Sequence, residues 1–231
     1  MTINHQSIYD LIIESGYQNK NATHIFEIKH NNEKCRRYYH HTKSLFDKIT
    51  LLEVEALSYL KKQDRILDIG AGAGRISMYL QIKRHNVTAL DKSKPICKVL
   101  TRRGIKKVIN VDIFKYFPRR KYDVVLFVGV YSIFDKKKEN ITKFLGYVKE
   151  KILNKDGKLI FILADANSGK TEIMKRRFIF KNKIGPWFES IYPSAKDIIK
   201  LAKENNLSIE EFKKNNSGQY FLISKRSPKS C

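Results

Sequence analysis

The 231-residue sequence predicts an α/β fold, in which a doubly wound, mostly parallel sheet of seven strands lies between two layers of helices. Two observations lead to this fold class. Short and nearly continuous apolar runs, such as YDVVLFVGV at 122–130, alternate with amphipathic segments, which is typical of parallel strands buried on both faces. A glycine-rich turn, GAGAG at 70–74, directly follows the first of these runs, and α/β proteins bind ligands at such turns.

The segment before the first parallel strand does not follow this alternation. Residues 1–62 are expected to form an N-terminal helical segment and lid, because they precede the sheet and can cover the edge at which its strands end. Apolar side chains recur every three or four residues between 45 and 60, which predicts an amphipathic helix there. Residues 63–231 are expected to form the core domain.

The core alternates strands with helices. One helix follows Gly74, Pro95 occupies the first turn of another, where proline is favoured, and Ser194 caps the last. A further helix is expected over 137–153. The five strands that these helices follow or precede are predicted at 65–69, 86–90, 107–111, 122–130 and 157–164.

Two additions follow the fifth strand. Residues 165–193 are expected to be an insertion that covers the sheet edge, since Phe178 and Phe180 alternate as in a strand. Strand-like runs at 207–212 and 219–224 predict a terminal β-hairpin. These two runs complete the seven strands.

The charge balance is strongly basic, with 46 Lys and Arg residues against 23 Asp and Glu residues and a net charge of +23. Such a charge creates a positive field that attracts polyanions, so nucleic acid is one partner class to consider. The basic residues are scattered along the sequence, however, and a lysine-rich composition also arises from compositional bias. We therefore favour a solvated basic surface over a nucleic-acid interface.

Composition also bears on the cellular environment. The three cysteines, Cys35, Cys97 and Cys231, are an odd number without the spacing of metal ligands, so we expect neither disulfides nor a metal. No segment reaches the ~18 consecutive apolar residues of a membrane span, and the first residues lack the pattern of a secretory signal. We expect a cytoplasmic protein without membrane contact, and the sequence indicates no particular oligomeric state.

Acidic residues accompany the glycine-rich turn. The nicotinamide fingerprint G-x-G-x-x-G/A needs a small third residue, and Arg75 stands at that position. The spacing is instead G-x-G-x-G, preceded by Asp68. Asp91 closes the second strand and Asp112 the third, so three carboxylates are expected at the carboxyl edge of the sheet.

Four stretches, ILDIGAGAGR, VTALDKS, VINVDIF and YDVVLFVGVYSIF, resemble the class I S-adenosylmethionine-dependent methyltransferases in order and spacing. The resemblance covers residues 63–164 and implies S-adenosylmethionine as the cofactor. It implies that Asp68 and the glycine-rich turn hold the methionine moiety, Asp91 the ribose and Asp112 the adenine. The cofactor contacts that it implies are Asp68, Gly70, Ala71, Gly72, Gly74, Arg75, Asp91, Lys92, Asp112, Ile113, Phe114 and Gly129.

Carboxylates at this edge also suit the chemistry of that cofactor. S-adenosylmethionine is a sulfonium cation, which three carboxylates suit better than they suit a pyrophosphate. In a chain of net charge +23, acids gathered at one edge are informative. An acid at the end of the second strand can also accept two hydrogen bonds from ribose hydroxyls. The residues and the resemblance therefore indicate the same class of enzyme.

Methyl transfer is an in-line displacement, which requires an aligned nucleophile, exclusion of water and, for some acceptors, removal of a proton. It needs no fixed catalytic residue. The run FVGVYSIF has neither the Asn/Asp-Pro-Pro-aromatic motif nor the Pro-Cys nucleophile of two common classes of nucleic-acid methyltransferase. A fainter similarity through GPWFESIYPSAKDIIKLAKENN is to bacterial enzymes with small or peptide acceptors that are largely unassigned.

We therefore expect a small-molecule or peptide acceptor. The alternative is an RNA methyltransferase, for rRNA or tRNA, that uses the basic surface. A noncatalytic binding protein with the same fold is less favoured. The noncatalytic hypothesis predicts that S-adenosylmethionine does not bind. The RNA hypothesis predicts that the affinity for the acceptor falls steeply as salt rises.

Aromatic and imidazole side chains are candidates for the acceptor side of the site. An aromatic face near the sulfonium can stabilise it by about 0.5 to 2 kcal/mol, and a histidine can serve as a base near neutral pH. The candidate acceptor-side residues are Tyr38, Tyr39, Tyr131 and Trp187, and the weak candidates for a base are His40, His41 and Tyr131. The adjacent histidines have no i, i+4 partner, so we expect no metal there.

Overall fold

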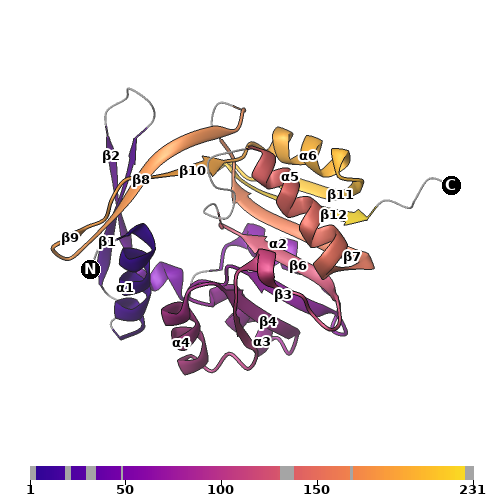
Figure 1. The fold of residues 1–231 in the computed structure, drawn as a ribbon, viewed down its shortest axis with the longest axis horizontal. Coiled ribbons are helices and arrows are strands. Elements are labelled where there is room, and N and C mark those ends of the chain that lie inside the picture. The colour runs from indigo at the N-terminus through magenta and orange to yellow at the C-terminus, as the bar shows by residue number, and fades with distance from the viewer. Residues whose placement is uncertain are drawn as a thin grey trace.

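The main sheet of the computed structural model has seven strands in the order β11-β12-β7-β6-β3-β4-β5 (Figure 1). The structure describes residues 4–18, 22–29, 35–47, 49–130, 138–166 and 169–226. Five neighbouring strands, β5, β4, β3, β6 and β7, run parallel to one another. Strand β12 is antiparallel to both β7 and β11. Their bounds are β3 (Arg65–Ile69), β4 (Asn86–Asp91), β5 (Val108–Asn110), β6 (Tyr122–Val128), β7 (Leu153–Ala164), β11 (Leu207–Lys214) and β12 (Gln219–Arg226). The predicted α/β class, the seven-stranded sheet and the terminal hairpin are confirmed.

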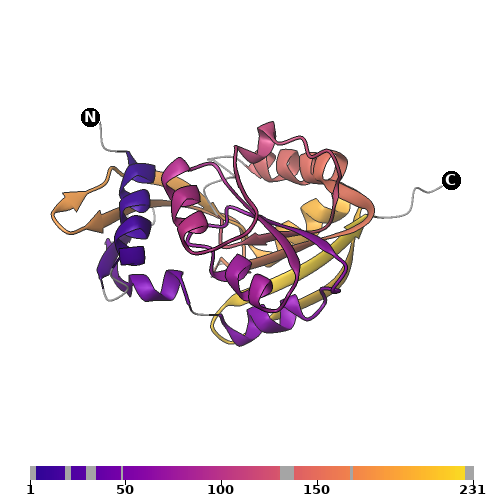
Figure 2. The ribbon, with the colours of Figure 1, turned by 90° about the horizontal axis from the view of Figure 1, so that it is seen from below.

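Helices cover both faces of this sheet, and alternate residues of β6 enter two separate cores. Val125 and Phe127 pack with residues of α5 and α6, whereas Val124 and Leu126 pack with residues of α2 and α3. Figure 2 shows α5 and α2 on opposite sides of the sheet. The helices are α2 (Leu51–Leu57), α3 (Arg75–Ile82), α4 (Lys94–Arg102), α5 (Lys138–Tyr147), which continues as the π-helical turn η4 (Val148–Ile152), and α6 (Ala195–Glu204).

A second sheet joins the N-terminal segment to the insertion. Its strands have the order β10-β8-β1-β2, and β9 pairs with β8. Phe26 on β1 lies opposite Phe178 on β8, so the two segments pair directly. Helix α1 (His5–Gln18) packs against this sheet through Ile8 and Ile12, which contact Phe180. The strands are β1 (Thr23–Lys29), β2 (Arg36–His41), β8 (Glu172–Phe180), β9 (Lys183–Ile184) and β10 (Phe188–Tyr192).

The N-terminal segment differs from the helical lid that the sequence predicts. Residues 5–18 are helical, but residues 23–29 and 36–41 are strands, because β8 offers β1 a backbone partner that the local sequence does not reveal, and β1 in turn pairs with β2. The helix predicted over 45–60 is also shorter and begins at Leu51. Thr50 is the N-cap of this helix and forms a capping box with Glu53. Thr50 Oγ1 accepts a hydrogen bond from the Glu53 N–H at 3.2 Å, and Glu53 Oε2 accepts one from the Thr50 N–H at 2.8 Å.

One buried carboxylate holds three strands of the second sheet together. Glu27 on β1 lies opposite Arg37 on β2 and Arg177 on β8. Its side chain is 3% exposed and accepts hydrogen bonds from Arg37 Nε at 2.8 Å and from Arg177 Nε at 2.5 Å. Burial alone would raise the pKa of Glu27, but the two arginines bring it below its ordinary value.

We expect Glu27→Gln to lower the Tm by roughly 3 to 8 °C near neutral pH, because two arginines then lose their buried counter-charge. Since the native pKa of Glu27 is lowered, its carboxylate stabilises the fold above the ordinary value of 4.5 and loses this effect as the pH falls through the native pKa. The difference between the variant and the unaltered protein should therefore shrink in acid. Thermal melts at neutral and acidic pH measure it.

The matched control is Glu204→Gln, because Glu204 belongs to an exposed pair with Lys200 at 3.8 Å. That variant should change the Tm by less than about 2 °C. An equal loss of Tm in both variants would show that the Glu27 contacts do not hold the second sheet.

Candidate functional site

A cavity of about 670 Å³ lies between the carboxyl edge of the main sheet and the second sheet. Its floor comes from the ends of β3, β4 and β6 and the loops that follow them, and its roof from α1, β1, β8 and β10. The volume is within the range of about 300 to 1,000 Å³ that small-molecule sites have. The second sheet thus partly covers this edge and gives the site a roof.

The glycine-rich turn at 70–74 forms part of the floor. Gly72 has φ +54° and Gly74 has φ +79°, a left-handed region that favours glycine. A Cβ at Gly72 would lie 3.4 Å from the hydroxyl of Tyr9, which is itself a cavity residue. At Gly74 the same atom would collide with the side chain of Leu100 on α4, and Gly74 is not among the residues that line the cavity. Gly74 therefore allows α3 and α4 to pack closely.

Asp68 is a buried acid at the end of β3. Its side chain lines the cavity, and the residue is 2% exposed. Ser77 Oγ donates a hydrogen bond to its Oδ2 at 2.7 Å. Burial raises the pKa of Asp68 to about 6 despite that bond. The charged form of this carboxyl is therefore poorly compensated by the protein alone.

Asp91, at the end of β4, connects the glycine-rich turn with α4. Its Oδ2 accepts from the Gly72 N–H at 3.1 Å, and its Oδ1 accepts from the Ser93 N–H at 2.9 Å. Burial raises the pKa of Asp91 more than these two bonds lower it. Asp112 accepts from the Phe114 N–H at 2.9 Å and lines the same cavity. The three predicted acids thus lie along the floor of one cavity, and we call this part of the floor the carboxyl wall.

Arg75 also lines the cavity, and Glu53 holds it in place. Its Nη1 donates to Glu53 Oε2 at 2.7 Å, and its Nη2 donates to Glu53 Oε1. Burial alone would raise the pKa of Glu53, but the bonds from Arg75 and Thr50 bring it below its ordinary value. The pair connects α2 to the first turn of α3, directly behind the glycine-rich turn.

The roof contributes residues that the sequence analysis did not single out. From α1 these are His5, Gln6 and Tyr9, and from the second sheet His24, Phe26, Arg176, Phe178, Phe188 and Tyr192. One signal was available: Arg176 interrupts the alternating series Met174, Phe178 and Phe180 on β8. The roof brings aromatic rings, imidazoles and one arginine over the carboxyl wall.

His24 is the most deeply buried imidazole of the roof. The residue is 6% exposed, and its Nδ1 has no hydrogen-bond partner among the described residues. Its ring stacks with that of His40, with the centroids 5.6 Å apart. Burial and the neighbouring His40 lower the pKa of His24 to about 4, so the ring is neutral near physiological pH.

The predicted site residues divide clearly. Eleven of the predicted cofactor contacts line the cavity: Asp68, Gly70, Ala71, Gly72, Arg75, Asp91, Lys92, Asp112, Ile113, Phe114 and Gly129. Of the acceptor-side and base candidates, His40 lines it, whereas Tyr38, Tyr39, His41 and Trp187 do not. The ring of Trp187 lies 4.6 Å from the guanidinium of Arg177 instead. Tyr131 lies outside the described residues.

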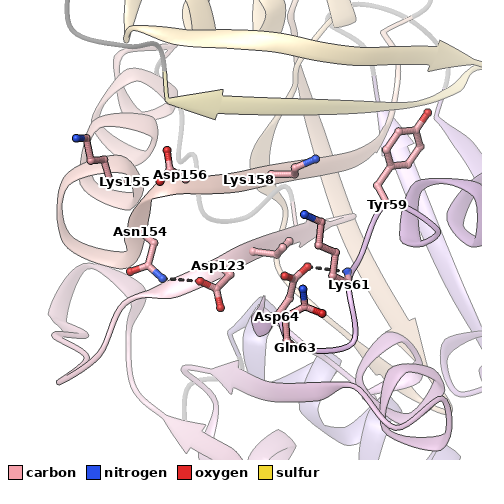
Figure 3. A pocket seen from close by; sticks show the side chains of 10 residues that line it. Tyr59, Lys61, Gln63, Asp64, Asp123, Asn154, Lys155, Asp156 and Lys158 are labelled. Atoms are coloured by element: carbon pink, nitrogen blue, oxygen red, sulfur yellow. Dashed lines mark hydrogen bonds between the residues drawn. The ribbon is translucent and has the colours of Figure 1, made fainter.

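A second hollow, of about 500 Å³, lies at the other end of the sheet (Figure 3). Its polar groups already bond to one another: Asp123 accepts from Asn154 Nδ2 at 2.6 Å, and Asp64 accepts from the Lys61 N–H at 2.7 Å. Parallel sheets bind ligands at the carboxyl ends of their strands, and this hollow lies beside the amino ends of β3 and β6. We therefore assign the chemistry to the larger cavity.

Two further features concern the described residues as a whole. No three His, Cys, Asp or Glu side chains among them come together as a metal ion would require. None of the helices in the described part of the chain has both the length and the apolar character needed to cross a lipid bilayer.

Comparisons with known proteins place the fold among methyl-transferring enzymes. A family model described as a methyltransferase domain matches residues 37–211. The chain is similar to a crystal structure of an S-adenosylmethionine-dependent methyltransferase from Bacteroides fragilis with S-adenosyl-L-homocysteine, with 22% identity, coverage of 95% and 94% and a TM-score of 0.77. No curated protein sequence matches the chain.

Two similar structures carry named activities. The 1,6-didemethyltoxoflavin-N1-methyltransferase of Burkholderia thailandensis, solved with 1,6-didemethyltoxoflavin and S-adenosylhomocysteine, has 14% identity, coverage of 76% of each chain and a TM-score of 0.59. The glycopeptide N-methyltransferase MtfA in complex with S-adenosylmethionine has 13% identity, coverage of 76% of this chain and 87% of its own, and a TM-score of 0.62. At these identities the likeness concerns the fold.

We expect Asp68→Asn to stabilise the ligand-free protein near neutral pH, by up to about 3 kcal/mol. Folding raises the pKa of Asp68 from 3.8 to about 6, so the unfolded state ionises first and stability falls as the pH rises through that window. An asparagine cannot ionise and avoids this loss. Denaturant titrations across the acidic and neutral range measure the difference.

Asp64→Asn, in the second hollow, serves as the control and should show no such gain. A neutral-pH stability of Asp68→Asn below that of the unaltered protein would contradict the prediction, because it would show that the fold favours the charged carboxylate.

Proposed function

The chain belongs to the methyltransferase domain family, and from this premise we propose that it transfers the methyl group of S-adenosylmethionine to a small-molecule or peptide acceptor. The observation that carries the proposal is the wall of three carboxyls, Asp68, Asp91 and Asp112, in a roofed cavity of a chain with net charge +23. Carboxyls whose charged forms the protein compensates poorly gain a counter-charge from a sulfonium cation.

The residues along this wall fit the parts of the cofactor. Both oxygens of Asp91 already accept one backbone N–H each, and a carboxylate oxygen has a second lone pair that can accept a ribose hydroxyl. We assign the methionine moiety to Asp68 and the glycine-rich turn, and the adenine to the segment from Asp112 to Phe114. When bound, S-adenosylmethionine supplies a methyl group on a sulfonium sulfur, which is an activated leaving group.

The remaining residues of the cavity orient the acceptor and exclude water. The roof of α1 and the second sheet lies over the carboxyl wall and limits its contact with bulk solvent. The imidazole of His24, neutral above about pH 4, lines the cavity without adding a charge to it. Burial and the charge of Asp91 raise the pKa of Tyr9 to about 12, so its phenol remains a donor.

An RNA acceptor is the alternative that the net charge raises. A continuous basic path through Arg176 and Arg177 into the cavity would favour it. The two side chains occupy consecutive positions on β8 and therefore lie on opposite faces, with Arg176 in the cavity and Arg177 bonded to Glu27. This arrangement supports the smaller acceptor.

We expect Asp91→Ala to weaken the binding of S-adenosylhomocysteine by about 10- to 100-fold, because two ribose hydroxyls lose a buried charged acceptor. Isothermal titration calorimetry on the folded variant measures the loss. Asp64→Ala, in the second hollow, is the matched control and should bind as the unaltered protein does. Equal affinities of Asp91→Ala and the control would refute the assigned ribose contact.

A failure of the unaltered protein to bind either S-adenosylmethionine or S-adenosylhomocysteine would favour a noncatalytic binding protein. Methyl transfer to RNA, with an affinity that falls steeply as salt rises, would instead favour the nucleic-acid alternative.

A further inference from the structure

Arg176 occupies a position that the pattern of β8 reserves for an apolar side chain. Strand residues two apart share a face, and on this face Arg176 stands between Met174 and Phe178, followed by Phe180. The residue is only 7% exposed and lines the cavity. Burying a guanidinium costs several kcal/mol relative to an apolar residue of similar size. A methionine at position 176, like Met174 on the same face, would fill the space without burying a charge.

Aromatic rings surround the guanidinium. Its Cζ lies 5.2 Å from the ring centre of Phe26, 5.5 Å from that of Phe188 and 5.5 Å from that of Tyr192. These contacts are with the faces of the rings and contribute cation–π attraction. A guanidinium is planar and carries five N–H donors, whose fork geometry matches the two oxygens of a carboxylate.

The same rings form an apolar wall suited to a flat molecule. Phe178 has three aromatic neighbours, with ring centres 5.3 Å away for Phe26, 5.4 Å for Tyr9 and 5.6 Å for Phe188. Flat rings stack on such faces with favourable offset or edge geometry. A ligand that combines a ring with an anionic group would use both the wall and the arginine.

The charges of the cavity also orient such a ligand. The floor carries the acids Asp68, Asp91 and Asp112 together with Lys92 and with Arg75, whose charge Glu53 neutralises, so acids outnumber uncompensated cations there, and Arg176 lies in the roof. A negatively charged group is therefore repelled from the floor and attracted to the roof, which leaves the opposite end of the molecule toward the carboxyl wall. A cationic acceptor would meet repulsion from Arg176, although aromatic walls alone would suit it.

We propose that the acceptor is a small aromatic molecule with an anionic group, and that Arg176 binds that group in the roof of the cavity. This rests on the proposed function and narrows its acceptor class. The sequence position of Arg176, its burial among rings and the charge division of the cavity each support it independently.

The test measures binding to protein saturated with S-adenosylhomocysteine. Benzoate, 4-hydroxybenzoate and indole-3-acetate serve as probes, each beside its neutral amide. We expect at least one acid to bind about 10-fold or more tightly than its amide, because charge-assisted hydrogen bonds to Arg176 discriminate the two. Equal or absent affinity for all three acid and amide pairs overturns the inference.

Arg176→Met tests the residue directly. This variant should lose the preference for the acid, and a cooperative thermal melt checks that it is folded. Lys175→Gln removes one positive charge from the exposed residue that directly precedes Arg176 on β8, and this control should keep the preference for the acid over its amide. A preference that persists in Arg176→Met, or disappears equally in Lys175→Gln, overturns the assignment.

Calorimetry with S-adenosylhomocysteine separates this inference from the proposed function. Arg176→Met should bind it as the unaltered protein does. If the unaltered protein does not bind it, the proposed function fails, and the acid and amide pairs measured on the free protein then decide the anion site separately.

Discussion

The antiparallel pairing of β1 with β8 is the constraint on which the rest of the site depends. It joins segments that are 150 positions apart at Glu27 and Arg177, and each segment supplies the backbone partners that the other lacks. Without this pairing, the main sheet would carry its glycine-rich turn and its acids at an open edge. With it, the same edge becomes the floor of a roofed cavity. On the face that carries Glu27, this carboxylate pairs with Arg37 and Arg177 and links the three strands, whereas the opposite face carries the residues that line the cavity.

The charged groups of the molecule fall into two kinds. Glu27 and Glu53 are buried but paired with arginines, and their pKa values are lowered, which is the signature of groups that hold the fold together. Asp68 and Asp91, in the cavity, have pKa values raised by burial. Their charged forms cost free energy in the folded protein. Such a cost is common at functional sites, where a bound ligand can stabilise the charged form of a group.

Local patterns predict the floor of this site well, because each relevant signal lies within a few residues. The glycine-rich turn, the strand ends and the acids at Asp68 and Asp91 belong to single βα units whose geometry the sequence determines locally. The roof could not be predicted in this way. Whether His24 or Tyr39 faces the cavity depends on the register of β1 with β8 and of β2 with β1, which are nonlocal properties, and a shift by one residue would reverse the answer. The capping box at Thr50 was local and readable, and it explains why the helix starts later than its apolar period indicates.

The distance along the chain between β1 and β8 also affects synthesis. β1 emerges from the ribosome first, and its partner follows about 150 positions later, which corresponds to roughly 8 to 30 seconds of elongation. During that interval β1 and β2 can pair only with each other, and Phe26 has no ring opposite it on β8. An unpaired strand edge is a template for other chains, and in a polysome the same edge of a neighbouring nascent chain is close at hand. The roof that protects the finished cavity from water is therefore the part of the nascent chain most exposed to pairing with another copy.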